Sequence, residues 1–229
     1  MLLVLSIVVP TLNEASHIAE TLGRLVSLRK RGAEVILVDG GSTDGTLDIA
    51  VAMADHVMVS AAGRATQMNV GAVAARGNTL LFLHADTSLP DDVDSLIEAA
   101  LERGHLWGRF DVSIRGQHPM LGVVARMMNL RSRLSGIATG DQAMFIQTEI
   151  FMAVGGFPRL ALMEDVALSK KLRAISPPAC IAERVNTSGR RWERHGVCRT
   201  ILLMWWLRLR YFLGADPDRL ARQYRREPD

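Results

Sequence analysis

Short apolar runs alternate with amphipathic stretches along the first half of the chain. Residues 4–9, 34–38, 56–59 and 80–83 are apolar runs of strand length. Each is followed by apolar residues at helical spacing, as at Ile18, Leu22 and Leu25, which predicts helices at 14–28, 43–54, 65–76 and 90–103. Strands that alternate with helices pair in parallel, so the pattern predicts an α/β fold with a mostly parallel sheet flanked by helices.

The regular alternation ends near residue 105. A strand is expected at 106–114, a helix at 119–134, a glycine-containing loop leading into a strand within 139–146, and a helix at 166–172. The length of 229 residues suits one α/β domain with an appendage better than two independent domains. We therefore expect one domain at 1–185 and a helical tail at 186–229.

The composition is that of a globular protein, with 48% apolar and 22% charged residues. Cys180 and Cys198 are its two cysteines, which offer neither a disulfide framework nor metal-ligand spacing, and this favours a reducing, cytoplasmic compartment. Residues 1–10 have no basic start and no cleavage site, so we expect a first strand there and not a signal peptide. The apolar stretch at 200–207 is too short to span a membrane.

The positive charge is concentrated in the tail. The chain carries a formal charge of +3, whereas eleven arginines against six acidic residues give residues 183–229 a charge of +5. Residues 199–213 combine Trp205 and Trp206 with an apolar helical face flanked by Arg208 and Arg210, which is typical of a helix that lies on a membrane surface. The alternative is a helix packed on the domain or on a second subunit.

Polar clusters follow three of the predicted strands. They occupy residues 11–14 after the first strand, 39–42 after the second and 84–86 after the fourth. The carboxyl ends of parallel strands meet at one edge of a sheet, where ligands bind, so this edge is expected to carry the chemistry. A tight turn with a helix cap explains Gly40, Gly41 and Ser42, but it does not explain the carboxylate of Asp39 at the end of a buried strand. The first loop lacks the glycine pattern of a dinucleotide site.

These segments resemble, in order and spacing, the inverting family 2 glycosyltransferases with the GT-A fold. Residues 8–14 (VVPTLNE), 38–45 (VDGGSTDG), 63–69 (GRATQMN) and 81–86 (LFLHAD) resemble the donor half of that family. Residues 140–142 (GDQ), 155–157 (GGF) and 163–165 (MED) resemble its acceptor half. The resemblance implies a GT-A-like domain with a nucleotide-sugar half at 1–90 and an acceptor half at 91–185. The tail is similar to a bacterial subfamily associated with arsenosugar or carotenoid-type (diaponeurosporenoate-like) glycosylation.

The resemblance also implies a donor site, in which a divalent metal ion, Mg²⁺ or Mn²⁺, held by Asp86 neutralises the departing nucleotide diphosphate. His84 replaces the first acid of the family's metal motif. The alternative interpretation is that His84 is a structural residue whose ring is hydrogen-bonded within the protein. Glu14 has the alternative of stabilising a helix N-terminus, and Arg64 and Gln67 that of a solvated helix face. The expected donor-binding residues are Pro10, Thr11, Glu14, Asp39, Arg64, Gln67, Asp86 and Arg191.

On the acceptor side, the resemblance implies a base at the start of the helix that follows Glu164 and Asp165. We choose Asp165 over Glu164, and we expect Asp141 to order the acceptor pocket or contact the sugar. The alternative for both acids is helix stabilisation alone. Arg190 and Arg191 fall where processive relatives carry Gln-x-x-Arg-Trp and are expected to clamp the diphosphate, although Ser188 stands in place of the glutamine.

The function expected from the sequence is transfer of a sugar from a nucleotide-diphosphate sugar to a hydroxyl or carboxyl of a small or lipid-like acceptor. Nucleic acid is not expected as a partner. Two alternatives stay open. The first is a nucleotidyltransferase, which would require a glycine-rich basic loop where Asn13 and Glu14 stand. The second is an inactive nucleotide-sugar-binding module, which would be consistent with a histidine, His84, in place of the first acid.

Overall fold

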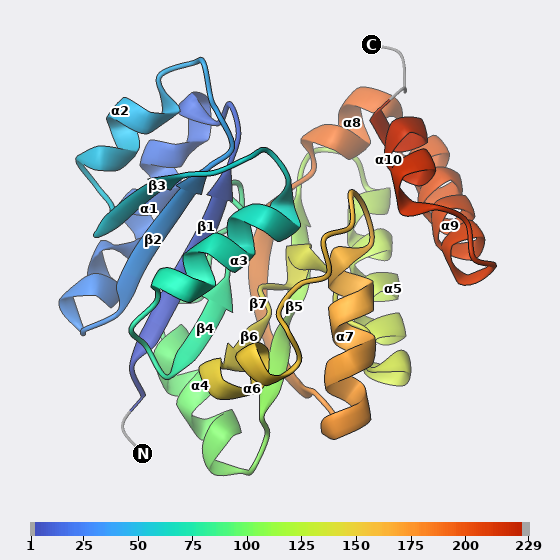
Figure 1. The fold of residues 1–229 in the computed structure, drawn as a ribbon. Helices are drawn as coiled ribbons and strands as arrows, with labels where there is room; N and C mark the ends of the chain where they lie inside the picture. Colours follow the sequence, from blue (N-terminus) through green and yellow to red (C-terminus); the bar gives the residue numbers. More distant parts are fainter. Residues whose placement is uncertain (1–2, 226–229) are drawn as a thin grey trace.

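A seven-stranded sheet runs through the centre of the protein, seen in a computed structural model that describes residues 3–225 (Figure 1). Its strands are β1 (Leu5–Thr11), β2 (Glu34–Asp39), β3 (His56–Val59), β4 (Thr79–Phe82), β5 (Trp107–Arg115), β6 (Phe145–Gln147) and β7 (Ala179–Ser188). Their order in the sheet is β3-β2-β1-β4-β6-β5-β7. β6 is antiparallel to both of its neighbours, and every other pair is parallel.

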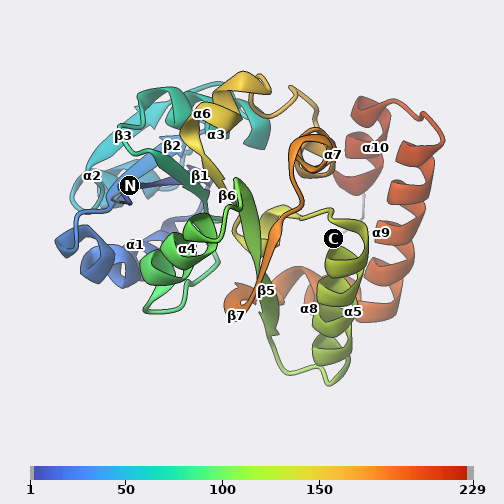
Figure 2. The ribbon, with the colours of Figure 1, turned by 90° about the horizontal axis from the view of Figure 1, so that it is seen from below.

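Helices cover both faces of the sheet, and Figure 2 shows the layers from below. They are α1 (Ala15–Lys30), α2 (Thr46–Val51), α3 (Arg64–Ala74), α4 (Val93–Glu102), α5 (Met120–Ser135), α6 (Thr148–Ala153), α7 (Glu164–Ile175), α8 (Arg190–His195), α9 (Val197–Phe212) and α10 (Pro217–Arg225), with a 3₁₀ turn η1 (Gly140–Gln142). One apolar core joins α1, α4 and α5 to one face, and a second joins α3, α6 and α7 to the other.

β1, β2 and β4 are almost entirely buried, which is why they are mostly apolar, whereas the edge strand β3 is partly exposed. Every residue of β1 is buried, and the parallel register pairs Thr11 with Asp39, so the carboxyl ends of β1 and β2 lie side by side. α3 packs closely over them at Gly71, where a Cβ would come within 2.4 Å of Val8. A larger residue would push the helix off the sheet, so the glycine sets the position of the N-terminus of α3.

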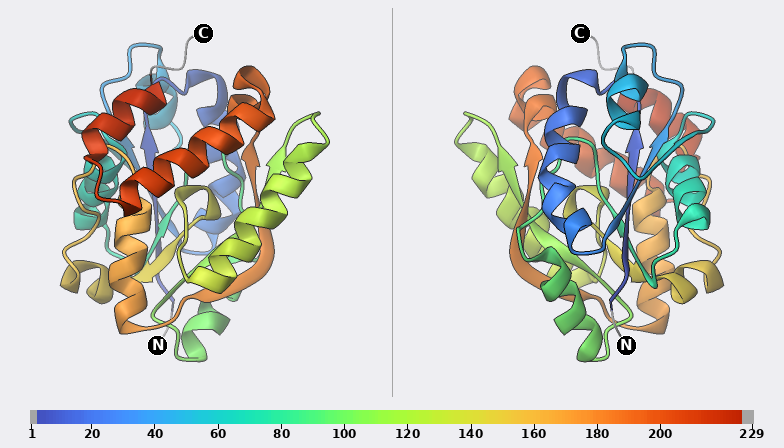
Figure 3. Two further views of the ribbon diagram at one scale, coloured as in Figure 1. Left: turned by 90° about the vertical axis from the view of Figure 1, so that its right-hand side faces the viewer. Right: turned by 90° about the vertical axis from the view of Figure 1, so that its left-hand side faces the viewer.

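The tail helices pack on the half of the domain that carries α5 and α7. Leu207 of α9 and Leu220 of α10 are buried with Ile137, Met163 and Val166 in a third apolar cluster. α9 runs alongside α5, as Figures 2 and 3 both show. The inner face of α9 is therefore packed on the domain while its outer face stays open.

The α/β fold with a mostly parallel sheet is confirmed, and each predicted element is present with ends shifted by a few residues. β7 was not predicted, because only Ala179, Val185 and Thr187 of this edge strand are buried and it lacks a continuous apolar run. It continues past residue 185, where the domain was expected to end. None of the helices in the part of the chain that the structure describes is both long enough and apolar enough to cross a membrane.

Candidate active site

The two loops after β1 and β2 interlock through side-chain to backbone hydrogen bonds. Asn13 Oδ1 accepts the N–H of Thr43 at 2.9 Å, and the Asn13 N–H donates to Ser42 Oγ at 2.8 Å. Asp44 Oδ2 accepts the N–H of Ala15 at the start of α1 at 3.0 Å. The two motifs are far apart in sequence, and these bonds make them one rigid surface at the edge of the sheet.

Asp39 lies fully buried beneath this surface and is bonded within its own loop. Its Oδ2 accepts the N–H groups of Gly41 at 2.8 Å and Ser42 at 2.7 Å, and its Oδ1 accepts from Ser42 Oγ. Gly41 has φ +93°, a conformation that only glycine adopts without strain, and it turns these N–H groups toward the carboxylate. The buried neighbours Pro10 and Thr11 complete the ends of the strands. Ribose or base binding by these residues stays a prediction.

Gln67 ties the donor loops together from below. Its side-chain N–H₂ donates to the carbonyls of Thr11 at 2.7 Å and Val38 at 2.9 Å, and its Oε1 accepts the N–H of Gly63 at 3.3 Å. The residue is 3% exposed. Its amide is thus occupied by backbone groups, which gives Gln67 a positioning task, and a direct contact with the donor stays a prediction.

Asp86, the expected metal ligand, faces an arginine of the tail. Arg190 Nη2 lies 3.6 Å from Asp86 Oδ2 and 3.5 Å from Glu14 Oε2, so one guanidinium joins the loop after β1 to the loop after β4. The neighbouring Arg191 points elsewhere: its Nη2 donates to the carbonyl of Tyr224 at 3.0 Å and its guanidinium stacks 3.6 Å from the Tyr224 ring centre. The structure thus brings Arg190 to the donor side.

Among residues 3–225, no group of three or more ligating side chains could hold a metal ion by itself. Asp86 is nevertheless suited to a site that the donor completes. Its side chain is partly exposed, and its contacts are a long hydrogen bond from Thr87 at 3.5 Å and the ion pair with Arg190. Mg²⁺ and Mn²⁺ commonly take one or two carboxylates and complete their shell with phosphate oxygens and water. The chemistry of Asp86 is therefore compatible with such a cation, and metal binding by Asp86 stays a prediction.

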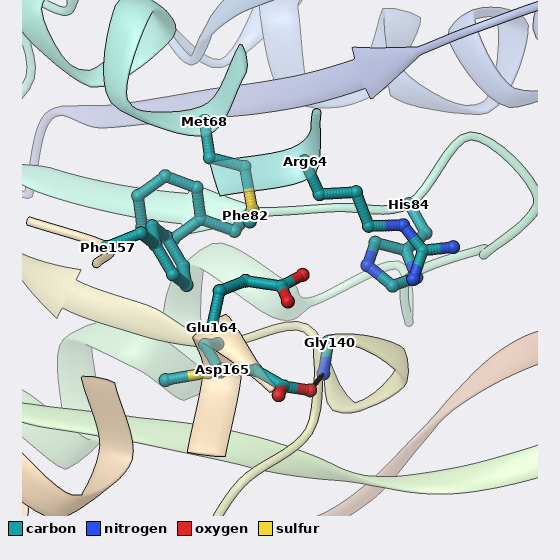
Figure 4. A pocket seen from close by; sticks show the side chains of 9 residues that line it. Arg64, Met68, Phe82, His84, Gly140, Phe157, Glu164 and Asp165 are labelled. Atoms are coloured by element: carbon teal, nitrogen blue, oxygen red, sulfur yellow. Dashed lines mark hydrogen bonds between the residues drawn. The ribbon is translucent and has the colours of Figure 1, made fainter. Parts of the chain in front are cut away.

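A cleft of about 320 Å³, open to solvent, lies beyond the ends of β4, between α3 and α7 (Figure 4). That volume includes the solvent-filled mouth of the cleft. Phe82, Phe157 and Met68 form an apolar wall on one side. The polar lining residues are Arg64, His84, Gly140, Glu164 and Asp165. The cleft is suited to a sugar ring and the group that attacks it.

His84 holds the acceptor-side loop against β4. Its Nδ1 lies 3.2 Å from Asp141 Oδ1, and its ring is so close to Gly140 that a Cβ there would lie 2.5 Å from Nε2. Burial raises the pKa of Asp141, but the hydrogen bond from His84 and the charges of His84, Arg64 and Arg208 outweigh it and lower the pKa overall. His84 is therefore partnered, and it positions Asp141.

Glu164 and Asp165 stand at the start of α7 and point into the cleft (Figure 4). Asp165 Oδ2 accepts the N–H of Gly140 at 2.9 Å and Oδ1 accepts the N–H of Val166 at 2.7 Å. Burial and the charge of Asp165 raise the pKa of Glu164 from 4.5 to about 7. The two adjacent acids thus lie in different environments, and the role of either as a base stays a prediction.

Sequence reasoning did not connect three groups that the structure brings together. The His84–Asp141 pair, the contact of Arg190 with Asp86, and the approach of Arg131 and Arg208 to the acceptor side join residues of distant segments. The charge count pointed to an arginine-rich tail, but no local pattern showed which of its arginines lie near the acids of the domain.

The family model described as glycosyl transferase family 2 matches residues 6–155. A glycosyltransferase of PGL/p-HBAD biosynthesis from Mycobacterium bovis is 39% identical over 102 residues, which covers 42% of this chain and 40% of that protein. The match covers between 33% and 40% of the length of the curated relatives.

Solved structures share the fold at lower identity. S. aureus TarS in complex with UDP-GlcNAc has a TM-score of 0.64 at 22% identity, covering 81% of this chain and 58% of that one. A mannosyltransferase from Pyrobaculum calidifontis in complex with GDP-Man and Mn²⁺ has a TM-score of 0.61 at 20% identity, covering 80% and 56%. These likenesses confirm the expected GT-A fold.

Proposed function

The chain belongs to glycosyl transferase family 2, and we propose that it transfers a sugar with inversion from a nucleotide-diphosphate sugar to a hydroxyl or carboxyl of a small or lipid-like acceptor, assisted by Mg²⁺ or Mn²⁺. The observation that carries the proposal is the cleft in which the acids that begin α7 face the residues at the end of β4. Base and leaving group need opposite sides of the reacting carbon, and the cleft lies between these two elements.

On the donor side, the loops after β1 and β2 form the surface for the nucleoside, with Thr11, Glu14 and Asp39 around it. A divalent cation held by Asp86 would stabilise the negative charge that develops on the diphosphate. Arg190 already lies beside Asp86 and Arg64 lines the cleft, so both guanidinium groups can bind phosphate oxygens.

On the acceptor side, Asp165 is the base. Its two backbone hydrogen bonds fix the carboxylate at the cleft wall, while Glu164 beside it has the raised pKa. The acceptor oxygen attacks the anomeric carbon, its proton passes to Asp165, and the bond from that carbon to the diphosphate breaks. Asp141, held by His84, lines the same side and orients the sugar or the acceptor.

The proposed membrane contact rests on the open face of α9 and extends to α5. Trp205 is 65% exposed, and it shares this face with Leu202, Trp206, Leu209, Phe212 and Leu213. Exposed apolar residues also recur on the adjacent helix α5, at Met120, Val123, Met127, Leu130 and Leu134. Single exposed apolar residues are common, but two neighbouring helices with such faces are typical of a docking surface.

The chemistry of this face favours a lipid surface. Arg199 and Arg126 are exposed on the same two helices, and Arg210 lies 5.8 Å from the ring centre of Trp206. Tryptophan prefers the headgroup level of a bilayer, and each basic residue near an anionic surface contributes about 1 kcal/mol. We place the protein at the inner face of the cytoplasmic membrane. The link to arsenosugar or carotenoid-type acceptors remains a prediction, to be tested with those acceptors directly.

The first test is a thermal-shift panel of UDP, GDP and other nucleoside diphosphates, with and without Mn²⁺ or Mg²⁺. The panel begins with UDP and GDP because the two similar structures hold UDP-GlcNAc and GDP-Man. A ligand that binds only the native state raises the melting temperature, so we expect a metal-dependent rise for one base. No rise for any nucleotide would refute the proposal.

Release of nucleoside diphosphate from the matching nucleotide sugar then separates an enzyme from an inactive binding module. The enzyme turns over the donor slowly with water in the absence of an acceptor and faster when an acceptor is added. A module that binds nucleotide with metal dependence but releases none would retain the fold and the donor site and lack the proposed activity.

A further inference from the structure

Three arginines from separate helices lie within electrostatic reach of the acids in η1 and at the start of α7. They are Arg64 at the start of α3, Arg131 in the last turns of α5, and Arg208 in the second half of α9. The charges of Asp141 and Asp165 act on all three guanidinium groups. Arg64 lies on the donor side with β4, whereas α5 and α9 lie at the opposite end of the sheet from β1 and β2 (Figure 2).

Arg131 is partly buried and lacks the partners that the neighbouring arginines have. Arg109 is paired with Asp111, and Arg133, on the same helix as Arg131, donates to Asp111 Oδ2 at 2.8 Å. In contrast, Nε and Nη2 of Arg131 are enclosed and have no hydrogen-bond partner among the residues that the structure describes. Burial and the charge of the nearby Arg208 lower the pKa of Arg131 to about 10. An enclosed guanidinium without an acceptor is unfavourable unless a ligand completes it.

The acids of the cleft are already engaged and do not complete this site. Asp141 is bonded to His84, and Asp165 accepts two backbone N–H groups. The pKa of Glu164 is raised to about 7, so this carboxyl is half protonated near neutral pH. None of these carboxylates accepts a hydrogen bond from Nε or Nη2 of Arg131, so these donors stay open to a ligand.

We propose that Arg131 and Arg208 bind a phosphate group carried by the acceptor and thereby place its nucleophilic oxygen beside Asp165. The inference rests on the proposed function and specifies its acceptor. A guanidinium offers a planar pair of N–H donors that matches phosphate oxygens, and a dianion relieves the repulsion between two adjacent cations. The phosphate belongs to the acceptor, because Arg131 and Arg208 reach Asp165 from α5 and α9, away from the nucleotide loops.

The phosphate has two conceivable sources, a lipid headgroup and a soluble phosphate ester. Both present the same oxygens to the two arginines. The helices α5 and α9, which carry Arg131 and Arg208, also carry the exposed apolar residues of the proposed membrane face, which favours a lipid phosphate.

The test compares the response to phosphate of the wild type and four variants. Arg131→Gln and Arg208→Gln remove the proposed ligands, and each has a control on the same helix: Arg126→Gln on α5 and Arg210→Gln on α9. Melting temperatures are measured against inorganic phosphate and glycerol phosphate at constant ionic strength. The nucleoside diphosphate found in the panel and Mn²⁺ are present throughout, so that the donor site is already filled.

Phosphate is expected to raise the melting temperature of the wild type and of both controls. Arg131→Gln and Arg208→Gln should need about tenfold to hundredfold more phosphate for the same rise, the range lost with one charge-assisted hydrogen-bonding partner. Flotation with phosphatidic acid vesicles supplies the lipid arm. Arg126 belongs to the proposed membrane face, so its loss also weakens flotation to some extent. A clearly greater loss of binding in Arg131→Gln than in Arg126→Gln assigns the phosphate to a lipid, and an effect confined to glycerol phosphate assigns it to a soluble acceptor.

The inference is overturned if the wild type does not respond to either phosphate source, or if Arg131→Gln and Arg208→Gln respond as the wild type does. The nucleotide shift in the same samples distinguishes this from a failure of the proposed function. A normal nucleotide shift with no arginine-dependent phosphate response removes the phosphate acceptor and leaves the glycosyltransferase. A missing nucleotide shift removes the donor site itself.

Discussion

Replacement of Glu164 by glutamine should change how the stability of the protein depends on pH. Glu164 is 7% exposed at the start of α7, where burial and then the charge of Asp165 raise its pKa from 4.5 to about 7. The folded protein therefore holds a proton on this carboxyl that the unfolded chain releases at lower pH. The stabilisation associated with a raised carboxyl pKa is fully present below pH 4.5 and is lost as the pH rises through 7.

The size of the effect follows from the interval between the two pKa values. Each pKa unit corresponds to 1.36 kcal/mol, so the interval from 4.5 to about 7 amounts to about 3 kcal/mol between pH 4 and pH 8. Glutamine has nearly the same shape and carries no charge at any pH. The stability of the wild type should therefore fall relative to that of Glu164→Gln by this amount, which for a domain of this size is about 6 to 12 °C in melting temperature.

The assay is thermal unfolding from pH 4 to pH 8, in which the melting temperature of the wild type is subtracted from that of each variant. Glu149→Gln, an exposed acid in the first turn of α6, is the matched control and should run parallel to the wild type. Asp165→Asn removes one cause of the raised pKa and should flatten the dependence in part. A difference in melting temperature between Glu164→Gln and the wild type that does not change with pH would refute the reasoning. It would show that Glu164 has the same pKa in the folded and the unfolded protein.

Three further predictions concern the donor, the base and the tail. Asp165→Asn should retain donor affinity and lower the transfer rate by about 10²-fold or more, which is the scale of a general base. The rate is measured as kcat with the nucleotide sugar that carries the nucleoside diphosphate identified by the thermal-shift panel. Asp86→Ala should abolish Mn²⁺-dependent nucleotide binding, measured by titration, and leave the circular dichroism spectrum unchanged. The wild type should float with anionic vesicles at low salt and be released at high salt, whereas a protein with both Trp205→Glu and Trp206→Glu should remain in solution.

Each of these has a contrary outcome. If Glu164→Gln is the inactive variant and Asp165→Asn is nearly normal, the two roles must be exchanged. Unchanged Mn²⁺-dependent affinity in Asp86→Ala would remove the metal ligand. A wild type that stays in solution with anionic vesicles at low salt would remove the membrane contact. Val73→Glu, which adds a charge to an exposed apolar site on α3, controls for the charge itself and should float normally.

The sequence determined the donor half of the fold because its information there is local. A strand buried on both faces must be mostly apolar along its length, and a helix on a sheet must repeat its apolar residues every three or four positions. Both patterns can therefore be recognised within a short stretch of sequence. The polar residues after β1, β2 and β4 must then meet, since parallel strands end at one edge. The pairing of Thr11 with Asp39 follows from that rule.

The second half depended more on tertiary contacts. β7 is an edge strand with an alternating, half-exposed pattern, and its pairing with β5, including a register shift after Phe110, cannot be read from residues 179–188 alone. The choice between Arg190 and Arg191 was also beyond the sequence. Neighbouring residues on a helix point about 100° apart, so the angle at which α8 meets the sheet decides which one reaches Asp86.

The charge of the cleft was decided entirely by packing. Composition showed a basic tail, but it could not show that Arg208 of α9 would meet Arg131 of α5 beside Asp165, because these residues come from three helices that are separate in sequence. Local patterns record which face of an element is apolar. The angle and depth at which the apolar faces of α5, α7 and α9 pack decide which polar side chains meet, and therefore which substrate the site can hold.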